Sequence, residues 1–175
     1  MNTQDTLRQQ LIGQPLPSLT LTATDHSSVD LSTLPGLSVV FIYPRSGNPE
    51  LPAPAEMASV PGAKGCTPQA CGFRDAFDDF AALGVQRIFG LSSQDTAYQQ
   101  ELKERTQLPY QLLSDQDCAL GKALGLPVYQ AGPLQVYGRA ALVIDDGRLA
   151  QLYTEIPEPA RNAEDILGWL RQAQS

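Results

Sequence analysis

The sequence predicts a mixed α/β fold, in which helices flank a central β-sheet, and three observations support this prediction. Apolar and β-branched runs typical of strands alternate along the chain with segments of helical periodicity. A hairpin late in the chain adds antiparallel strands, which makes the sheet a mixed one. The length of 175 residues, with 42% hydrophobic and 18% charged residues, is typical of one globular domain with a core. We therefore expect a single domain over residues 1–175.

The strands are predicted from β-branched and aromatic runs. Residues 38–43 (SVVFIY) have the composition of a buried central strand. The sequence Asp146-Gly147 supplies the positive φ angles of a tight turn between residues 140–144 and 148–153, which predicts a hairpin. The remaining predicted strands are residues 19–22, 85–91 and 111–113.

The helices are predicted from apolar spacing and from capping residues. Residues 67–83 carry apolar side chains every three or four positions, with Thr67 as the expected N-cap, Pro68 as the first helical residue and Gly84 at the end. The other predicted helices are residues 95–105, capped by Asp95, and residues 117–124 and 162–174.

A proline-rich segment interrupts this pattern. Residues 44–61 contain five prolines, which excludes a helix or a central strand there. We therefore expect an insert at about residues 44–63, and because it ends just before Cys66 we expect it to shape a site.

Charge and composition exclude several functions. The net charge is −7 and the basic residues are scattered, which argues against nucleic acids and anionic membranes as partners. No apolar run approaches the roughly 18 residues of a transmembrane helix. The polar N-terminal segment lacks an apolar signal region, which predicts a cytoplasmic location.

Three cysteines and one histidine limit the chemistry. An odd number of cysteines in a chain of this length does not indicate a structural disulfide framework. His26 lies in a polar turn, and we expect it to be exposed and outside any site. A zinc site would need His26 together with Cys66, Cys71 and Cys118, without any paired short spacing, so no metal site is predicted.

Cys66 has the surroundings of a reactive thiol. It lies at the start of the best-capped predicted helix, where unsatisfied amides and the helix dipole favour a thiolate. Lys64 and Arg74 add positive charge nearby. The alternative is that Cys66 is a small buried hydrophobic residue.

Cys71 follows Cys66 by five residues, which corresponds to a rise of about 7.5 Å in a helix. The resulting Cα separation of roughly 8–9 Å exceeds the limit of about 7 Å for a disulfide. A bond between Cys66 and Cys71 would therefore require the first helical turn to unwind, and Gly72 weakens the helix. Cys118 is expected to be a partly buried bystander, with the alternative that it resolves a disulfide.

Residues 65–75 (GCTPQACGFRD) resemble the active-site segment of peroxiredoxins. The C-x4-C spacing is similar to the bacterioferritin-comigratory-protein group, also called the peroxiredoxin Q type, of the AhpC/TSA superfamily. Further segments resemble the family in the same order along most of the chain: residues 12–17, 41–44, 90–92, 112–115 and 139–145.

The resemblance implies a thioredoxin-like fold and a peroxidase that reduces hydrogen peroxide and organic hydroperoxides without a cofactor. It implies that Cys66 is the peroxidatic cysteine, which becomes a sulfenic acid. Cys71 would be the resolving cysteine of an intramolecular disulfide, which thioredoxin or a similar dithiol reductant opens. Arg139 would stabilise the thiolate and orient the peroxide, the alternative being an ordinary surface charge. Similar proteins are often monomeric, so a monomer or weak dimer is expected.

The sequence departs from the family pattern before Cys66. The family has a proline seven residues and a threonine or serine three residues ahead of that cysteine, and neither is present here. Pro44 is expected to be the family proline, displaced by the insert. Ser46 is the first candidate for the missing hydroxyl and Ser59 the second, and backbone amides near Cys66, at Thr67, are a third.

Two other functions stay open at this point. A thioredoxin-fold oxidoreductase acting on protein thiols would lack an efficient reaction with small peroxides. A non-enzymatic redox sensor would be oxidised once, without turnover by a reductant.

Overall fold

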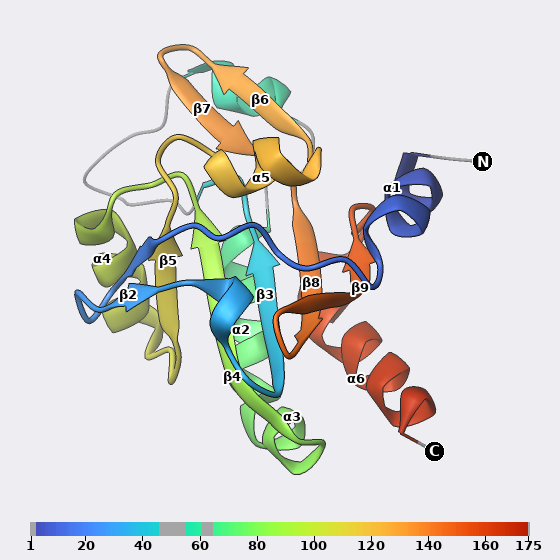
Figure 1. Ribbon diagram of the computed structural model, residues 1–175. Helices are drawn as coiled ribbons and strands as arrows, with labels where there is room; N and C mark the ends of the chain where they lie inside the picture. The colour runs from blue at the N-terminus through green and yellow to red at the C-terminus, as the bar shows by residue number, and fades with distance from the viewer. Residues whose placement is uncertain (1–2, 46–54, 61–64, 175) are drawn as a thin grey trace.

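A seven-stranded sheet with the order β2-β1-β5-β4-β3-β8-β9 runs through the molecule (Figure 1). The structure is a computed structural model that describes residues 3–45, 55–60 and 65–174. The three strands β3, β4 and β5 are parallel, whereas β1, β8 and β9 add antiparallel edges, so the sheet is mixed as predicted. The strands of the sheet are β1 (Leu21–Ala23), β2 (Ser28–Val29), β3 (Leu37–Ile42), β4 (Val85–Ser92), β5 (Gln111–Ser114), β8 (Ala140–Asp145) and β9 (Arg148–Tyr153).

Helices cover both faces of this sheet. Side chains of α2 (Cys66–Asp75), α3 (Phe77–Ala82), α4 (Thr96–Thr106) and α6 (Asn162–Ala173) share one buried cluster. Side chains of α1 (Thr3–Leu11) and α5 (Ala119–Leu124) share the cluster on the opposite face. Three short 3-10 turns complete the described helices: η1 (Leu31–Thr33), η2 (Ala55–Ser59) and η3 (Pro159–Arg161).

The central strand β3 divides the core between these two layers. Val39 and Phe41 face the layer of α2 and α6, whereas Val40 and Ile42 face the layer of α1 and α5, and all four are fully buried. This burial on both sides explains why the run is continuously apolar. Gly90 lets the ring of Phe41 lie flat on β4, because a Cβ at that position would come within 2.7 Å of the ring.

The predicted fold class is confirmed, and so is the late hairpin, with Asp146 and Gly147 at positive φ between β8 and β9. His26 lies exposed in its turn, as predicted. The expected single helix over residues 67–83 is wrong in two respects. It begins at Cys66 with Gly65 as the N-cap instead of Thr67, and Ala76 interrupts it between α2 and α3.

The rings of Phe73 and Phe80, one on each side of Ala76, stack with their centroids 5.7 Å apart, so α2 and α3 pack together across the interruption.

Two elements carry little sequence signal. The helix α1 is mostly polar and packs on the core through Leu7 and Leu11 alone among its described side chains, and the hairpin of β6 (Val128–Ala131) and β7 (Leu134–Tyr137) forms a separate two-stranded sheet. The turn η2 belongs to the predicted insert, and Met57 and Val60 pack against this hairpin. The rest of the insert, residues 46–54 and 61–64, lies outside the described residues.

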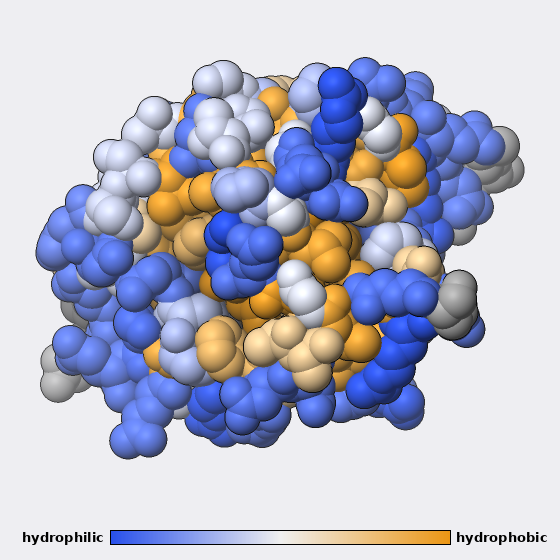
Figure 2. Space-filling view, turned by 60° about the horizontal axis from the view of Figure 1, so that its bottom comes forward, coloured by the Kyte–Doolittle hydropathy of each residue, from blue (hydrophilic) through white to orange (hydrophobic). Residues whose placement is uncertain are grey.

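The surface is mostly hydrophilic. Figure 2 shows apolar residues across the middle of one face, ringed by hydrophilic ones. Within the described part of the chain, Ile12 is the most exposed large hydrophobic residue, with 41% of its surface accessible. The other large apolar residues on this face therefore expose only a smaller part of their surface. Among these same residues, no helix combines the length and the apolar character needed to span a membrane.

Candidate active site

The start of α2 is built to hold a negative charge. Gly65, the N-cap, adopts a φ of 103°, which glycine tolerates without strain, and no side chain caps the helix there. The first intrahelical bond is donated by the Gln69 amide to the Gly65 carbonyl at 3.0 Å, and Pro68 has no N–H. The amides of Cys66 and Thr67 therefore precede the hydrogen-bonded turns, where helices bind anions.

Arg139 lies directly against Cys66. It precedes β8 and is only 5% exposed, and its Nη2 donates to Cys66 Sγ at 3.3 Å. Its Nη1 donates to Gln69 Oε1 at 2.6 Å. A surface role for Arg139 is therefore wrong, because the side chain is buried. The guanidinium and the helix N-terminus both bring positive charge to the Cys66 sulfur.

Gln69 and Asn162 extend this contact into a chain of hydrogen bonds. Gln69 Nε2 donates to Asn162 Oδ1 at 3.0 Å, and both side chains are buried. Sequence reasoning missed both residues. The available signal for Gln69 was a polar residue one turn after Cys66, on the apolar face of the helix. Asn162 has no such signal, because it stands at a helix start, where asparagine is common.

The end of β3 brings further residues to this region. Tyr43 and Pro44 are buried, and Tyr43 belongs to the same apolar cluster as Cys66. Burial raises the pKa of the Tyr43 hydroxyl well above its ordinary value, and negative charge on Cys66 raises it further. The Tyr43 hydroxyl is therefore neutral, and its side chain packs in the same cluster as Cys66.

The structure describes only some of the remaining predicted site residues. Thr67 is half-buried beside Cys66. Ser46 and Lys64 lie outside the described residues, and so does the side chain of Ser59. The Arg139–Cys66 contact is thus the part of the predicted site that the described residues bring together.

The three cysteines occupy two separate places, and none forms a disulfide in this structure. Cys66 and Cys71 share α2, with Cys66 buried and Cys71 half-buried. Cys118 is buried on the opposite face of the sheet. Burial raises the pKa of the Cys118 thiol to about 11, and the charge of Asp115 adds to this. A thiol with that pKa is a poor nucleophile near neutral pH. Within the described ranges, no three His, Cys, Asp or Glu side chains are grouped as a metal site.

Comparisons with known proteins identify the family to which the chain is similar. The family model described as Redoxin matches residues 11–167. The chain is 32% identical over 157 residues to the chloroplastic peroxiredoxin Q of Oryza sativa subsp. japonica; this covers 89% of the chain but only 64% of that relative's length. The structure of peroxidoxin BcpB from Mycobacterium tuberculosis is similar with a TM-score of 0.76 and 25% identity, over 94% of this chain and 99% of that one.

A second solved structure is reduced Prx3 from Vibrio vulnificus in complex with H2O2. It has a TM-score of 0.72 and 26% identity, over 93% of this chain and 97% of that one. These likenesses confirm the expected thioredoxin-like fold.

Proposed function

The chain belongs to the Redoxin family and, within it, to the peroxiredoxins of the Q type, and from this we propose that it is a thiol-dependent peroxidase. The observation that carries the proposal is the buried contact of 3.3 Å between Arg139 Nη2 and Cys66 Sγ at an uncapped helix start. Family membership favours this function over a protein-thiol oxidoreductase or a redox sensor.

In the first step, the Cys66 thiolate attacks the terminal oxygen of a hydroperoxide. The O–O bond breaks and an S–O bond forms, which leaves Cys66 as a sulfenic acid. The departing oxygen takes up a proton and leaves as water or an alcohol. We propose that Arg139 and the amides at the start of α2 stabilise the charge that develops on the departing oxygen.

The substrates are hydrogen peroxide and organic hydroperoxides. Hydrogen peroxide is supported by the Vibrio vulnificus relative, which was solved in complex with it. Pro44 is proposed to shield the pocket at the end of β3, and the Thr67 amide to contact the peroxide. Ser46 remains the first proposed source of the hydroxyl that the family normally places three residues before the cysteine.

In the second step, Cys71 attacks the sulfur of the Cys66 sulfenic acid. A disulfide forms and water leaves. Since α2 includes both residues, their five-residue spacing corresponds to a rise of about 7.5 Å, too far for a disulfide. The start of α2 must therefore unwind. Thioredoxin or a similar dithiol reductant then restores both thiols by exchange.

This cycle fits a reducing compartment, and we propose the cytoplasm, although the plant relatives are chloroplastic. A thiol that must be regenerated each turnover needs a supply of reduced dithiol. We propose a monomer or weak dimer, because all the residues assigned to the cycle come from one chain.

One experiment tests this function. Reduced protein is mixed with one equivalent of hydrogen peroxide, and the three cysteines are mapped by peptide mass spectrometry. We expect a disulfide between Cys66 and Cys71, with Cys118 still a thiol. Amide exchange over the start of α2 should be faster in this oxidised protein than in the reduced protein.

The matched variants are Cys66→Ser and Cys118→Ser. Cys66→Ser should abolish peroxide consumption, whereas Cys118→Ser should consume peroxide at the wild-type rate, since Cys118 lies on the other face of the sheet. Survival of all three thiols in the wild-type protein would refute the peroxidase proposal.

A further inference from the structure

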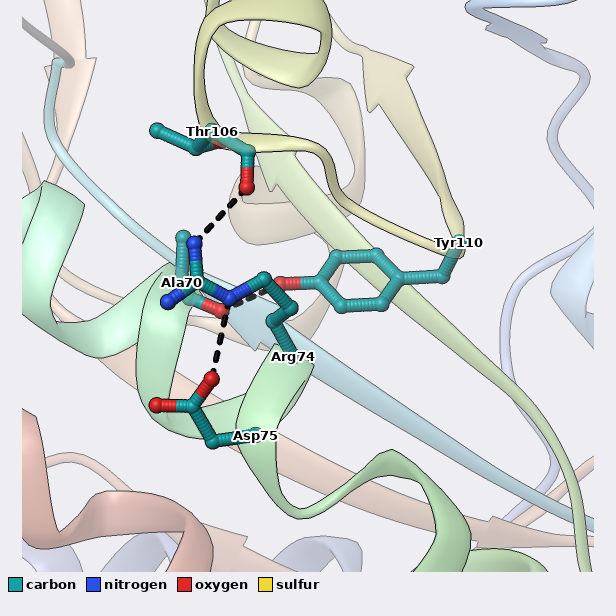
Figure 3. Close-up of polar contacts among 5 residues, drawn as sticks. All are labelled: Ala70, Arg74, Asp75, Thr106 and Tyr110. Carbon is teal, nitrogen blue, oxygen red and sulfur yellow. Dashed lines mark hydrogen bonds and ion pairs between the residues drawn. The ribbon is translucent and has the colours of Figure 1, made fainter.

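The second half of α2 is held by residues that the mechanism above does not use (Figure 3). The Tyr110 hydroxyl donates to the Ala70 carbonyl at 2.6 Å. Arg74 Nη1 donates to the Thr106 carbonyl at 2.8 Å, and Arg74 Nε donates to the Asp75 carboxylate at 2.9 Å. The bonds to Tyr110 and Thr106 fasten the helix on either side of Cys71 to the end of α4 and to the connection that follows it.

Helical geometry places Arg74 beside Cys71. Residues three apart on a helix are surface neighbours, about 5–6 Å apart at Cβ. Gly72 and Gln69 face the other way, since Gly72 lies against the Ala160 carbonyl of η3 and Gln69 bonds to Asn162 of α6. Cys71 therefore faces away from η3 and α6.

The charges around Cys71 come from its own helix and from Tyr110. The hydrogen bond to Asp75 raises the pKa of the Arg74 guanidinium, and negative charge on Cys71 raises it further. Burial raises the pKa of Tyr110 well above its ordinary value, so this hydroxyl stays neutral and Arg74 is the cation beside Cys71. Asp75 is 70% exposed, so solvent weakens its opposing charge.

The two halves of α2 differ in how they are held once Cys66 is oxidised. The Phe73 ring stacks on Phe41 at 4.7 Å, which anchors the second half independently of the redox state. The contact of Arg139 with Cys66 gains its strength from the thiolate charge, and a sulfenic acid is neutral. Oxidation therefore loosens the Cys66 end while the Cys71 end stays in place.

We infer that Arg74 is a positioning residue for the resolution step, which holds Cys71 stationary and keeps a positive charge beside its sulfur while Cys66 moves toward it. This inference rests on the proposed function. The Cys71 thiolate attacks the sulfur of the Cys66 sulfenic acid, the S–S bond forms, the S–O bond breaks, and hydroxide leaves and takes up a proton to become water. The two electrons come from the Cys71 sulfur, and the peroxide consumed in the first step is the only oxidant.

The test is rapid-quench kinetics on the full chain with one equivalent of hydrogen peroxide. Sulfenic acid at Cys66 is trapped with dimedone, and the Cys66–Cys71 disulfide is quantified by mass spectrometry. Arg74→Gln should form the sulfenic acid within about twofold of the wild-type rate but form the disulfide about tenfold more slowly at pH 7, because the attacking sulfur loses a neighbouring positive charge. This deficit should shrink at high pH, where the attack depends less on that charge.

Two variants separate charge from structure. Arg74→Lys keeps the charge and should recover at least a third of the wild-type disulfide rate. Arg105→Gln removes an exposed arginine of α4 that pairs with Glu101, and it should match the wild type. A rate for Arg74→Gln that is unchanged, or that is slowed equally at every pH, would overturn the inference. So would an Arg74→Lys variant as slow as Arg74→Gln.

A second measurement does not depend on peroxide. In the Cys66→Ser background, iodoacetamide should alkylate Cys71 several-fold more slowly at pH 7 when Arg74 is also replaced by Gln. Equal alkylation rates would overturn the role of Arg74, whereas a wild-type protein that forms no sulfenic acid would overturn the proposed function instead.

Discussion

Replacing Gln69 by methionine tests whether a buried amide aims Arg139 at Cys66. Methionine has a similar length but neither donates nor accepts a strong hydrogen bond. The change removes the bond of 2.6 Å from Arg139 Nη1 and the bond of 3.0 Å to Asn162 Oδ1. Both partners are at most 5% exposed, so water does not readily replace what is lost.

The magnitude follows from these two bonds. A hydrogen bond to a charged group contributes about 1.5–3 kcal/mol and a neutral one about 1 kcal/mol. We therefore expect Gln69→Met to lower the free energy of unfolding by about 3 kcal/mol. The guanidinium would also lose the contact that orients it, and a misplacement of about 1 Å costs up to 100-fold in rate. We expect peroxide attack by Cys66 to slow by about 10- to 100-fold.

The assay combines urea unfolding with stopped-flow measurement of the second-order rate constant for hydrogen peroxide. Gln69→Glu keeps an acceptor for Arg139, and the Asn162 amide can turn its Nδ2 to donate, so this variant should recover most of the lost stability. Its negative charge near Cys66 opposes the attacking thiolate, so the rate should stay slow. Gln130→Met is the matched control, since Gln130 is exposed and bonds only within its own turn, to the Gly132 carbonyl. An unchanged rate constant in a folded Gln69→Met variant would show that Gln69 does not position Arg139.

Two further predictions concern the opposite face of the sheet. Asp115 accepts hydrogen bonds from the amides of Ala119 and Leu120 and from the Tyr137 hydroxyl. Asp115→Ala should therefore lower the free energy of unfolding, measured in urea, by about 3 kcal/mol. A loss of less than about 1 kcal/mol would contradict this prediction. Burial raises the pKa of Cys118 from 9.0 to about 11, so its neutral thiol favours the folded state below pH 9 and this contribution is lost as the pH rises toward 11. Between pH 8 and 11, the free energy of unfolding of the wild type should therefore fall by about 2 to 3 kcal/mol more than that of Cys118→Ala, as measured by parallel urea titrations. Equal losses would show that the pKa of Cys118 is not raised by burial.

The parts of the fold that the sequence predicts are those with local signals. The turn at Asp146-Gly147 needs positive φ angles, and residues 38–43 are apolar throughout because both faces of β3 are buried. The position of Cys66 at a helix start was also a local signal. In contrast, α1 is mostly polar, packs on the core through Leu7 and Leu11, and is held by contacts such as the bond from Arg8 Nε to the Leu152 carbonyl, 144 residues away.

The site itself was less accessible to sequence reasoning, because its contacts join distant segments. Arg139 was reached only through the resemblance to a family, since nothing local distinguishes it from a surface arginine. The bond between Gln69 and Asn162 spans 93 residues, and either residue alone has an ordinary explanation. The N-cap was misassigned to Thr67 because threonine has a strong capping preference, whereas Gly65 is used for its φ of 103°.

The weak capping of α2 serves both steps of the proposed reaction. The helix α4 begins with Asp95, whose side chain accepts from the Tyr98 amide, but α2 begins with Gly65 and has no side-chain cap. A capping side chain would occupy amides that the thiolate and the peroxide need, and it would also stabilise the helix by about 1 kcal/mol. Both effects oppose the chemistry, because the first step needs those amides accessible and the second needs the same turn to unwind. In the reduced protein, the bonds from Arg139 to Gln69 and to Cys66 stabilise this turn instead of a side-chain cap. The bond from Arg139 to Cys66 weakens once the sulfur is oxidised to a neutral sulfenic acid.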